Sequence, residues 1–444
     1  MKPTQPSLAE QLAAAARATL AVEQGRSLGD VLPQVPARLR PGVQALTFHA
    51  LRHWGEASAL RALLLQRPPP ASVHALVGVA LTLLLPAAAQ GSNTVYPAHT
   101  VVDQAVAALR ALGQGERLSG LVNACLRRYL RERDTLTASA LEDAVARWNH
   151  PFWWVQRVRR DHPQQWQAIL AANNAPAPMV LRVNRRRISR EDYLRALQAQ
   201  GLQAWPVGPD GLVLERAVAV EVLPGWAQGQ CSVQDAAAQR AAPLLIDGAA
   251  LKAGARVLDA CAAPGGKTAH LLECADLDLL ALDADPQRAE RIHDTLHRLG
   301  LKAEVRAADA AQTAEWWDGR PFDAILLDAP CTASGIVRRH PDVRWLRRAS
   351  DVDQLVAQQR RLLAALWPTL APGGRLLYCT CSVFCAEGEA QVQSFLQAQA
   401  DALRLPAPGH LLPGGAAQSG EIGHNAECGE DGFFYALLQK SGRP

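Results

Sequence analysis

The sequence predicts a chain of three parts: an all-α region, a small α+β module and an α/β domain with a doubly wound parallel sheet. Residues 8–135 show helical periodicity with almost no strand signal. The final part alternates apolar strand-like runs with helical stretches, which is typical of a parallel sheet with helices on both faces. With 444 residues, the chain is also too long for one ordinary core. We therefore predict domains at residues 1–145, 146–230 and 231–444.

Helices are expected throughout the first region. Pro and Gly separate its periodic segments, as at Pro68–Pro70 and Gly113–Gly115. The segment Ala75–Leu85 is apolar and uncharged, but it is too short to span a bilayer and Pro86 ends it, so we expect a buried helix. The predicted helices are Leu8–Gln24, Val43–Gln66, Val73–Leu85, Val101–Leu112 and Leu118–Arg131.

The α+β module is predicted to begin near Asn149–Pro151, where the pattern changes. Met179–Val183 and Gly211–Glu215 are expected to be short strands, and Arg190–Gln200 between them is expected to be a helix. We expect the arginine-rich stretch Arg182–Arg190 to lie on the surface of this module.

The α/β domain is predicted from five apolar runs that alternate with helices, and Phe433–Leu438 adds a late strand. The five strands are Arg256–Ala260, Leu279–Asp283, Ala303–Asp309, Phe322–Asp328 and Gly374–Thr380, and the helices are Lys267–Glu273, Pro286–Leu299, Asp351–Leu370 and Glu387–Gln399.

Charge and cysteine content narrow the class of protein. The net charge is only +4, but arginine greatly outnumbers lysine and is clustered. Such clusters can neutralise phosphates, which favours a nucleic-acid partner. For any one cluster, the alternative is that the genome encodes Arg in place of Lys on an ordinary solvent-exposed face. Nine cysteines, with no apolar signal-peptide core in Met1–Glu10, favour a reducing cytoplasm and free thiols. The clusters hold Arg127, Arg128, Arg131 and Arg133; Arg157, Arg159 and Arg160; Arg182, Arg185, Arg186, Arg187 and Arg190; and Arg338, Arg339, Arg344, Arg347 and Arg348.

A glycine turn after the first strand of the α/β domain predicts a nucleotide-like site. In Val257–Thr268, Gly265 and Gly266 let a ligand approach the backbone closely, and the following helix offers unpaired N–H groups. Asp283 lies at the tip of the second strand, where a carboxylate can accept hydrogen bonds from ribose hydroxyls.

Two classes of ligand fit this turn. Gly266-Lys267-Thr268 and the strand ending at Asp328 resemble parts of a P-loop NTPase, but a P-loop needs a glycine where this chain has Cys261. The ribose-directed Asp283, with Asp309 at the end of the third strand, instead favours an adenosine cofactor such as S-adenosylmethionine. A glycine turn that only packs a helix on a strand is the structural alternative.

Two cysteines follow the last two strands of the predicted parallel sheet. Cys331 and Cys381 thus lie at the edge where ligands bind, and two thiols there suggest covalent catalysis by one and assistance by the other. Zinc binding by Cys379, Cys381 and Cys385 with His424 or Cys428 is an alternative, but the spacing matches no standard zinc motif, so we expect no metal. The remaining cysteines are expected to act as small buried hydrophobes: Cys125, Cys231, Cys274 and Cys428.

A thiol beside S-adenosylmethionine suits methylation of a pyrimidine at carbon 5. This carbon is too weak a nucleophile to accept a methyl group unaided, and a thiolate that adds at carbon 6 activates it. An acid is then needed at ring N3, and Asp328 serves if it holds or shares a proton. Spacing alone leaves open which cysteine attacks.

Three motifs, in this order, resemble those of the Sun/Nop2-type RNA cytosine-5 methyltransferases. They are Asp-Ala-Cys-Ala-Ala-Pro-Gly-Gly-Lys-Thr from Asp259, Asp-Ala-Pro-Cys from Asp328 and Thr-Cys-Ser from Thr380. A NusB-like helical domain joined to such a Rossmann-like methyltransferase is typical of the bacterial enzymes that modify small-subunit rRNA. Further segments resemble the NusB-like domain, the connecting module or the family's other motifs: Leu121–Arg128, Leu181–Asn184, Val233–Ala236, Gly335–Asp342 and Asp431–Tyr435.

The resemblance implies roles for the site residues. Cys381 would be the nucleophile and Cys331 the cysteine that aids product release, whereas DNA cytosine-5 methyltransferases attack with the Pro-Cys cysteine. Two residues depart from the family pattern: Ala308 replaces a glycine before Asp309, and Cys379 replaces a small residue. The implied contacts to S-adenosylmethionine are Cys261, Ala262, Ala263, Pro264, Gly265, Gly266, Lys267, Asp283, Asp309 and Asp328.

The resemblance also implies the substrate and the setting. The target would be cytosine 967 of 16S rRNA in the family's usual numbering, in free RNA or in an assembling small subunit. A cytoplasmic monomer with no metal and no membrane contact is expected. Another rRNA or tRNA cytosine is one alternative, and an RNA-binding or assembly adaptor is another.

Overall fold

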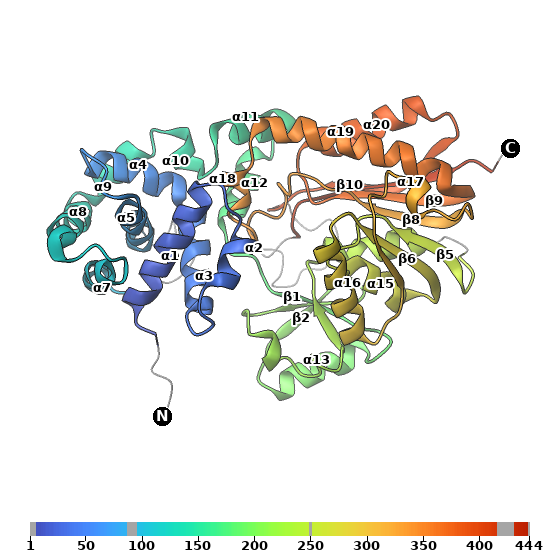
Figure 1. Cartoon of the computed structure of the whole chain (residues 1–444), viewed down its shortest axis with the longest axis horizontal. Coiled ribbons are helices and arrows are strands. Elements are labelled where there is room, and N and C mark those ends of the chain that lie inside the picture. The colour runs from blue at the N-terminus through green and yellow to red at the C-terminus, as the bar shows by residue number, and fades with distance from the viewer. Residues whose placement is uncertain (1–5, 87–95, 248–250, 415–429, 443–444) are drawn as a thin grey trace. The chain divides into compact units, whose positions relative to one another are not determined.

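The computed structural model describes residues 6–86, 96–247, 251–414 and 430–442 (Figure 1). The chain forms two compact units. The helical unit comprises residues 1–176 and 337–349, and the sheet unit comprises residues 177–336 and 350–444. The chain therefore leaves the sheet unit after Ile336 and returns to it at Ser350. The domain boundaries predicted after residues 145 and 230 stay predictions.

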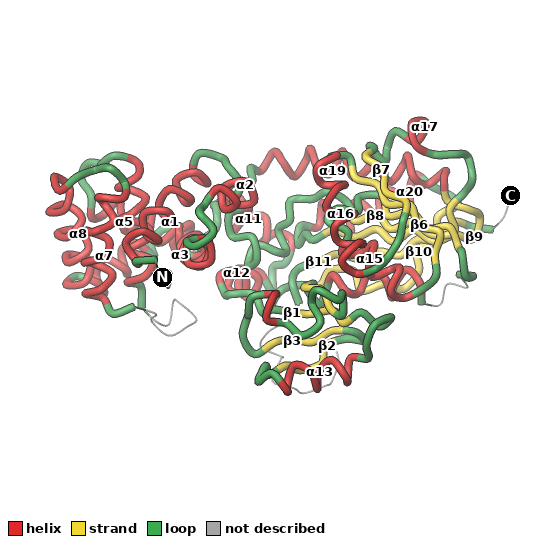
Figure 2. Tube along the Cα trace, turned by 60° about the horizontal axis from the view of Figure 1, so that its bottom comes forward, coloured by secondary structure: helices red, strands yellow, loops and turns green. Residues whose placement is uncertain are grey.

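The described part of the helical unit contains helices and no strands, as predicted (Figure 2). Its first helix, α1 (Leu8–Glu23), begins with a capping box: the Ser7 hydroxyl accepts the Glu10 N–H, and the Glu10 carboxylate accepts the Ser7 N–H. Helix α5 (Ala71–Leu84) is buried along most of its length, which confirms the predicted buried helix. Among the described residues, no helix is long and apolar enough to cross a membrane.

The prediction of one helix over Val43–Gln66 was wrong. Two helices, α3 (Arg40–Arg52) and α4 (Trp54–Leu64), meet at His53, whose φ of −115° and ψ of 16° interrupt the helix. After this change of direction, α4 packs closely against the segment that contains Val145. A Cβ on Gly55 would lie only 2.3 Å from the Val145 carbonyl oxygen, so the contact requires glycine. The other elements of this unit are α2 (Leu28–Val31), η1 (Leu32–Gln34), α7 (Ala98–Ala111), η2 (Glu116–Leu118), α8 (Ser119–Arg131), α9 (Arg133–Ala140), α10 (Ala144–Trp148), α11 (Phe152–Asp161), α12 (Trp166–Asn174) and α18 (Val343–Leu346).

The segment Val337–Ala349, which follows the Cys331 loop in the chain, is built into the helical unit. Arg344 on α18 is fully buried and donates hydrogen bonds to the carbonyl oxygens of Asn149 and Asn173. Within the same unit, the indole N–H of Trp345 donates to the Leu51 carbonyl at 2.8 Å. Arg344 is therefore a structural residue rather than part of a phosphate-binding surface.

The connecting module folds as a four-stranded antiparallel sheet in the order β2-β3-β1-β4. The predicted strands correspond to β1 (Val180–Val183) and β3 (Gly211–Leu214), and the predicted helix to α13 (Arg190–Ala199). Strands β2 (Ala204–Val207) and β4 (Cys231–Val233) were missed. They are only four and three residues long, too short to show a period of two.

The large sheet has the strand order β10-β11-β9-β8-β5-β6-β7. The five strands predicted to be parallel are parallel. At one edge, however, β11 pairs antiparallel with β9, and β10 pairs antiparallel with β11, so the sheet is mixed rather than wholly parallel. The strands are β5 (Ala255–Asp259), β6 (Leu277–Asp283), β7 (Glu304–Ala307), β8 (Phe322–Asp328), β9 (Leu370–Thr380), β10 (Ala402–Leu411) and β11 (Phe433–Lys440).

Helices cover both faces of this sheet (Figure 1). Successive side chains along a strand alternate between two cores: Val257 packs in one core with Ile292 of α16, and Leu258 packs in the other with Leu362 of α19. The strand order reverses between β5 and β8, and the carboxyl ends of parallel strands at such a reversal are where ligands bind. The helices and short turns of this unit are η3 (Val220–Val222), η4 (Ala238–Arg240), α14 (Ala241–Ile246), α15 (Gly266–Cys274), α16 (Pro286–Leu299), α17 (Thr313–Trp316), α19 (Ala349–Leu366), η5 (Trp367–Thr369), η6 (Cys385–Glu387) and α20 (Glu389–Ala398).

Candidate active site

The glycine turn after β5 is shaped by Gly265. Its φ of +95° lies in the left-handed region, and a Cβ there would lie 3.2 Å from the Ile292 Cα, so the turn requires glycine. Helix α15 begins at the next residue, Gly266, and therefore presents its first N–H groups at the strand ends.

A buried carboxylate that we did not predict, Asp259 at the end of β5, supports this turn. Its Oδ2 accepts a hydrogen bond from the Thr268 hydroxyl at 2.6 Å, and its Oδ1 has no hydrogen-bond partner among the described residues. Burial raises the pKa of Asp259 to about 7. In the sequence, Asp259 is an acid that ends an apolar strand and begins the first of the three family motifs.

Asp283 lies where the sequence predicts, at the end of β6. Its two oxygens accept the N–H groups of Ala263 in the glycine turn and of Asp285, at 3.2 and 3.1 Å. Arg288 Nη2 lies 3.4 Å from the same carboxylate. The side chain is thereby held in one orientation beside the turn.

Asp309 lies two residues beyond β7 rather than at its last residue. Arg361 of α19 forms an ion pair with it at 2.9 Å. Burial opposes ionisation, but the hydrogen bond from the Ala311 N–H and the charge of Arg361 outweigh burial and lower the pKa of Asp309. Asp309 is thus a charged carboxylate near neutral pH.

Asp328, at the end of β8, forms a compact ion pair with Lys267 of the glycine turn. Lys267 Nζ lies 2.6 Å from Asp328 Oδ2, and the Cys379 thiol donates to the other oxygen at 3.4 Å. Burial disfavours the ammonium, but Asp328 outweighs burial and raises the pKa of Lys267. The structure thus brings together Lys267 and Asp328 from two of the motifs and Cys379, which directly precedes the third.

The two cysteines singled out from the sequence lie in contact. Cys331 Sγ and Cys381 Sγ are 3.4 Å apart, beyond the ends of the neighbouring strands β8 and β9. Cys331 is only 8% exposed, whereas Cys381 is more exposed to solvent. The hydrogen bond with Cys381 and burial raise the pKa of Cys331 well above its usual range. Cys331 is therefore held as a neutral thiol, and a hydrogen bond joins the two sulfurs.

Two glycines of the family motifs bring the loops around these thiols together. The Gly335 N–H donates to the Cys381 carbonyl at 2.9 Å, and the Gly432 N–H donates to the Gly335 carbonyl at 2.9 Å. A Cβ on Gly335 would lie 2.0 Å from the Gly432 carbonyl oxygen. No side chain fits at this contact, which explains why both positions are glycine.

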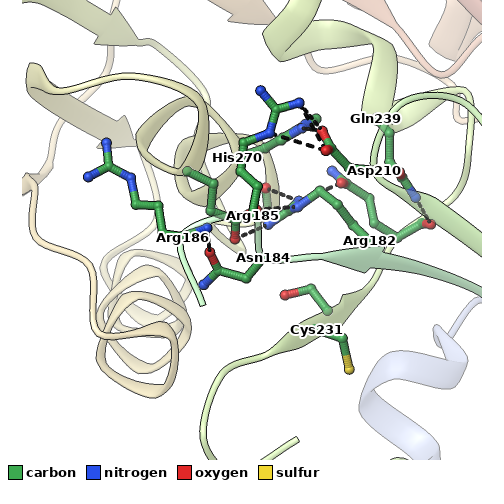
Figure 3. Close-up of polar contacts among 12 residues, drawn as sticks. Arg182, Asn184, Arg185, Arg186, Asp210, Cys231, Gln239 and His270 are labelled. Atoms are coloured by element: carbon green, nitrogen blue, oxygen red, sulfur yellow. Dashed lines mark hydrogen bonds and ion pairs between the residues drawn. The ribbon is translucent and has the colours of Figure 1, made fainter. Parts of the chain in front are cut away.

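The prediction that the arginines of Arg182–Arg190 lie on the surface was wrong for Arg182. Its guanidinium is fully buried, pairs with both oxygens of Glu273 on α15 at 2.8 Å, and donates to the Gly266 carbonyl at 2.8 Å (Figure 3). Leu181 and Val183 pack in the core of the module, so the Arg182 side chain between them points to the opposite face of the sheet, where its partners on α15 lie. The connecting module thereby supports the glycine turn.

Among the described residues, one group could hold a metal: Asp210, His270 and Cys274. Arg185, however, donates to both oxygens of Asp210, at 2.9 and 2.8 Å, and its positive charge disfavours a cation there (Figure 3). The alternative zinc ligands Cys379, Cys381 and Cys385 form no such group. Its other members, His424 and Cys428, lie outside the described residues.

The site lies at the switch point of a doubly wound sheet. It combines a glycine turn, a carboxylate at the end of the second strand and two thiols in contact. This combination indicates an enzyme of the methyltransferase type. Family models agree along the chain: the NusB family matches residues 9–131, the RsmF/B-like ferredoxin-like domain residues 150–221, and 16S rRNA methyltransferase RsmB/F residues 249–439.

Relatives of this chain cover nearly its whole length. Ribosomal RNA small subunit methyltransferase B of Xanthomonas campestris is 45% identical, with 98% of each chain covered, and that of Vibrio cholerae is 40% identical, with 96% of each covered. A methyltransferase homolog from Pyrococcus horikoshii superposes with a TM-score of 0.55 at 28% identity, over 67% of this chain and 97% of its own. The chain belongs to the ribosomal RNA small subunit methyltransferase B family. The predicted NusB-like, α+β and Rossmann-like folds are confirmed, and the α+β module is ferredoxin-like.

Proposed function

We propose that the protein transfers a methyl group from S-adenosylmethionine to carbon 5 of a cytosine in 16S rRNA, cytosine 967 in the family's usual numbering. The observation that carries this proposal is the 3.4 Å contact between the sulfurs of Cys331 and Cys381 beside the glycine turn. The relatives, named for methylation of small-subunit rRNA, support this class of substrate.

The residues at the strand ends fit S-adenosylmethionine. Cys261 to Lys267, with Asp283, Asp309 and Asp328, would hold it. Gly265 keeps the backbone open to a close ligand, and Asp283 is fixed by two backbone N–H groups for contact with a ribose. When bound, this cofactor supplies an electrophilic methyl group on a cationic sulfur.

Cys381 is proposed as the nucleophile. It is the more exposed thiol, and the protonated Cys331 is proposed to donate a hydrogen bond to its sulfur. The Cys381 thiolate forms a bond to carbon 6 and makes carbon 5 nucleophilic. The proton required at ring N3 is proposed to come by way of Asp328, whose carboxylate accepts a hydrogen bond from the Lys267 ammonium at 2.6 Å.

Cys331 is proposed to act after methyl transfer. Once Cys381 is bound to carbon 6, it carries no negative charge and no longer accepts a hydrogen bond from Cys331. The largest cause of the raised pKa of Cys331 is then gone. Cys331 is proposed to lose its proton to water, and its thiolate then takes the proton from carbon 5. The electron pair of that C–H bond forms the double bond between carbons 5 and 6, the bond between carbon 6 and Cys381 breaks, and Cys381 leaves as a thiolate. The contact between the sulfurs thus orders the two steps.

RNA binding is proposed to use exposed arginines on both sides of the NusB-like fold. Arg127 and Arg128 on α8, and Arg159 and Arg160 on α11, are exposed. Such contacts to phosphates give affinity and orientation but do not specify a sequence. The target base has to leave any stack to reach Cys381.

Two variants test the assignment on unmodified 16S rRNA, both as free RNA and in small-subunit particles. We expect Cys381→Ser to form no covalent RNA adduct and to transfer no labelled methyl. Cys331→Ser should accumulate an adduct that survives denaturation, because addition proceeds and release stalls. The opposite pattern would reverse the roles. If the wild type transfers no labelled methyl group to free 16S rRNA or to small-subunit particles, an RNA-binding adaptor remains as the function.

A further inference from the structure

A buried carboxylate, Glu387, links the two cysteine loops. It lies at the end of η6, and its side chain is fully buried. Its Oε1 accepts the backbone N–H of Thr332, the residue directly after Cys331, at 2.8 Å. Its Oε2 accepts the hydroxyl of Ser382, the residue directly after Cys381, at 2.6 Å. One side chain thus holds the residue that follows each cysteine.

Further contacts make Glu387 the centre of a network. The Thr332 hydroxyl donates to Oε2, and Gln359 of α19 donates to Oε1 at 3.2 Å. The same Gln359 amide donates to the carbonyl of Pro330, directly before Cys331, at 2.9 Å. The Glu387 carbonyl accepts the Tyr378 hydroxyl of β9 at 2.8 Å. The network therefore reaches both sides of the Cys331 position and the strand that leads to Cys381.

The donors around Glu387 require an acceptor there. Ser382, Thr332 and Gln359 are each fully buried, so no water replaces a lost partner at low cost. Burial raises the pKa of Glu387, while the hydrogen bonds from Ser382 and Thr332 act in the opposite direction. Both carboxylate oxygens accept hydrogen bonds, an arrangement that suits the ionised form.

We infer that Glu387 is a positioning residue: its carboxylate fixes the backbone after Cys331 and Cys381 and so sets the distance between the two sulfurs. The inference rests on the proposed function, because it assumes that both thiols act on one base. The Glu387 carboxylate accepts hydrogen bonds from Thr332 and Ser382, so it acts on the two sulfurs through the residues that directly follow each cysteine.

The test measures the sulfur pair without RNA or cofactor. Phenylarsine oxide is captured tightly only by two neighbouring thiols, and Cys381→Ser serves as the blank. We expect Glu387→Gln to weaken this capture about tenfold. The N–H₂ group of the new side chain would face the hydrogen-bond donors around this position, so one of the two cysteine loops must shift. Glu389→Gln, the same change two residues along in an ion pair with Arg404, should capture as the wild type does.

A second measurement links the geometry to the reaction. In the Cys331→Ser background, Glu387→Gln should form the RNA adduct roughly 100-fold more slowly, because small misplacements of reacting groups cost such factors. Binding of S-adenosylmethionine should stay within about twofold, since Glu387 does not contact the glycine turn. If Glu387→Gln does not fold, Ser382→Ala and Thr332→Val each remove one hydroxyl donor to the Glu387 carboxylate, and each should give part of the same loss.

The results separate the two claims. Capture by Glu387→Gln at the wild-type level would overturn the inference, whatever the enzyme does to RNA. A loss of capture, with no methyl transfer by the wild type, would support the positioning of the thiols while the proposed function fails. A loss of capture with the slower adduct would support both.

Discussion

The buried ion pair between Arg182 and Glu273 offers a direct test of how the ferredoxin-like module supports the glycine turn. The two side chains are 0% and 1% exposed, and two hydrogen bonds of 2.8 Å join them. Arg182→Met removes the cation and leaves Glu273 buried without a counter-charge. Breaking such a pair costs about 3–5 kcal/mol. The same change also deprives the Gly266 carbonyl of its donor.

A double variant separates the charge from the packing. Arg182→Met with Glu273→Met removes both charges and keeps similar volumes, which in other buried pairs is nearly neutral. The Gly266 carbonyl and Gln234 still lose a partner, at about 1 kcal/mol each. We therefore expect the double variant to lie about 2 kcal/mol below the wild type, and above Arg182→Met alone.

Urea unfolding followed by tryptophan fluorescence measures these differences. Arg185→Met is the matched control: Arg185 is 45% exposed and its partner Asp210 is 11% exposed, so solvent screens this pair more than the Arg182–Glu273 pair and the expected cost is smaller. Burial raises the pKa of Glu273, and losing Arg182 raises it further. The loss of stability caused by Arg182→Met should thus be smallest at pH values below the ordinary pKa of Glu. It should grow as the pH rises through the raised pKa of Glu273. A double variant no more stable than Arg182→Met would refute this reasoning.

Three shorter predictions concern the turn, the module and the cysteine loop. Gly265→Ala should weaken S-adenosylmethionine binding about tenfold or more in calorimetry, because its φ is +95° and the added Cβ meets Ile292; Gly254→Ala, with φ +78° and open space, tests the strain alone. Burial lowers the pKa of His270 to about 4, so the wild type should lose up to ~3 kcal/mol of stability as the pH falls from about 6.5 to about 4. In His270→Gln, the urea midpoint should no longer depend on pH in this way. Gly335→Ala should abolish methyl transfer but retain cofactor binding, because its Cβ would lie 2.0 Å from the Gly432 carbonyl oxygen; wild-type turnover would show that the loop tolerates the shift.

Elements with strong local signals could be predicted from the sequence, and elements made by tertiary pairing could not. Helix α16 has the predicted bounds, Pro286–Leu299, because Asp285 caps its start, Pro286 is its first residue and Gly300 ends it in the left-handed region. Strand β10 contains Pro406, Pro408 and Gly409, which read as a loop. Those residues are tolerated because β10 is an edge strand that pairs on one side only.

The candidate site divides in the same way. The glycine turn, Asp283, Asp328 and the two cysteines could be placed because each follows a recognisable strand, and parallel strands end at one edge. Glu387 and Arg182 could not. In the sequence, Glu387 is an acid at the start of a predicted helix, and Arg182 is one of several arginines in a polar stretch. Their roles arise only when segments far apart in the chain meet, as Thr332, Ser382 and Gln359 do around Glu387.

The proposed roles of the two cysteines follow from their surroundings and not from their chemistry, since both are thiols in contact with each other. Cys381 directly follows the last residue of β9, and its sulfur is the more exposed one. Cys331 lies three residues beyond β8, in a loop held from both sides by Gln359 and Glu387, and there it is buried. The hydrogen bond with Cys381, together with burial, raises the pKa of Cys331, so in the proposed mechanism Cys331 stays protonated until Cys381 has reacted. A change that exposes Cys331 without moving it should therefore affect release of the product before it affects attack.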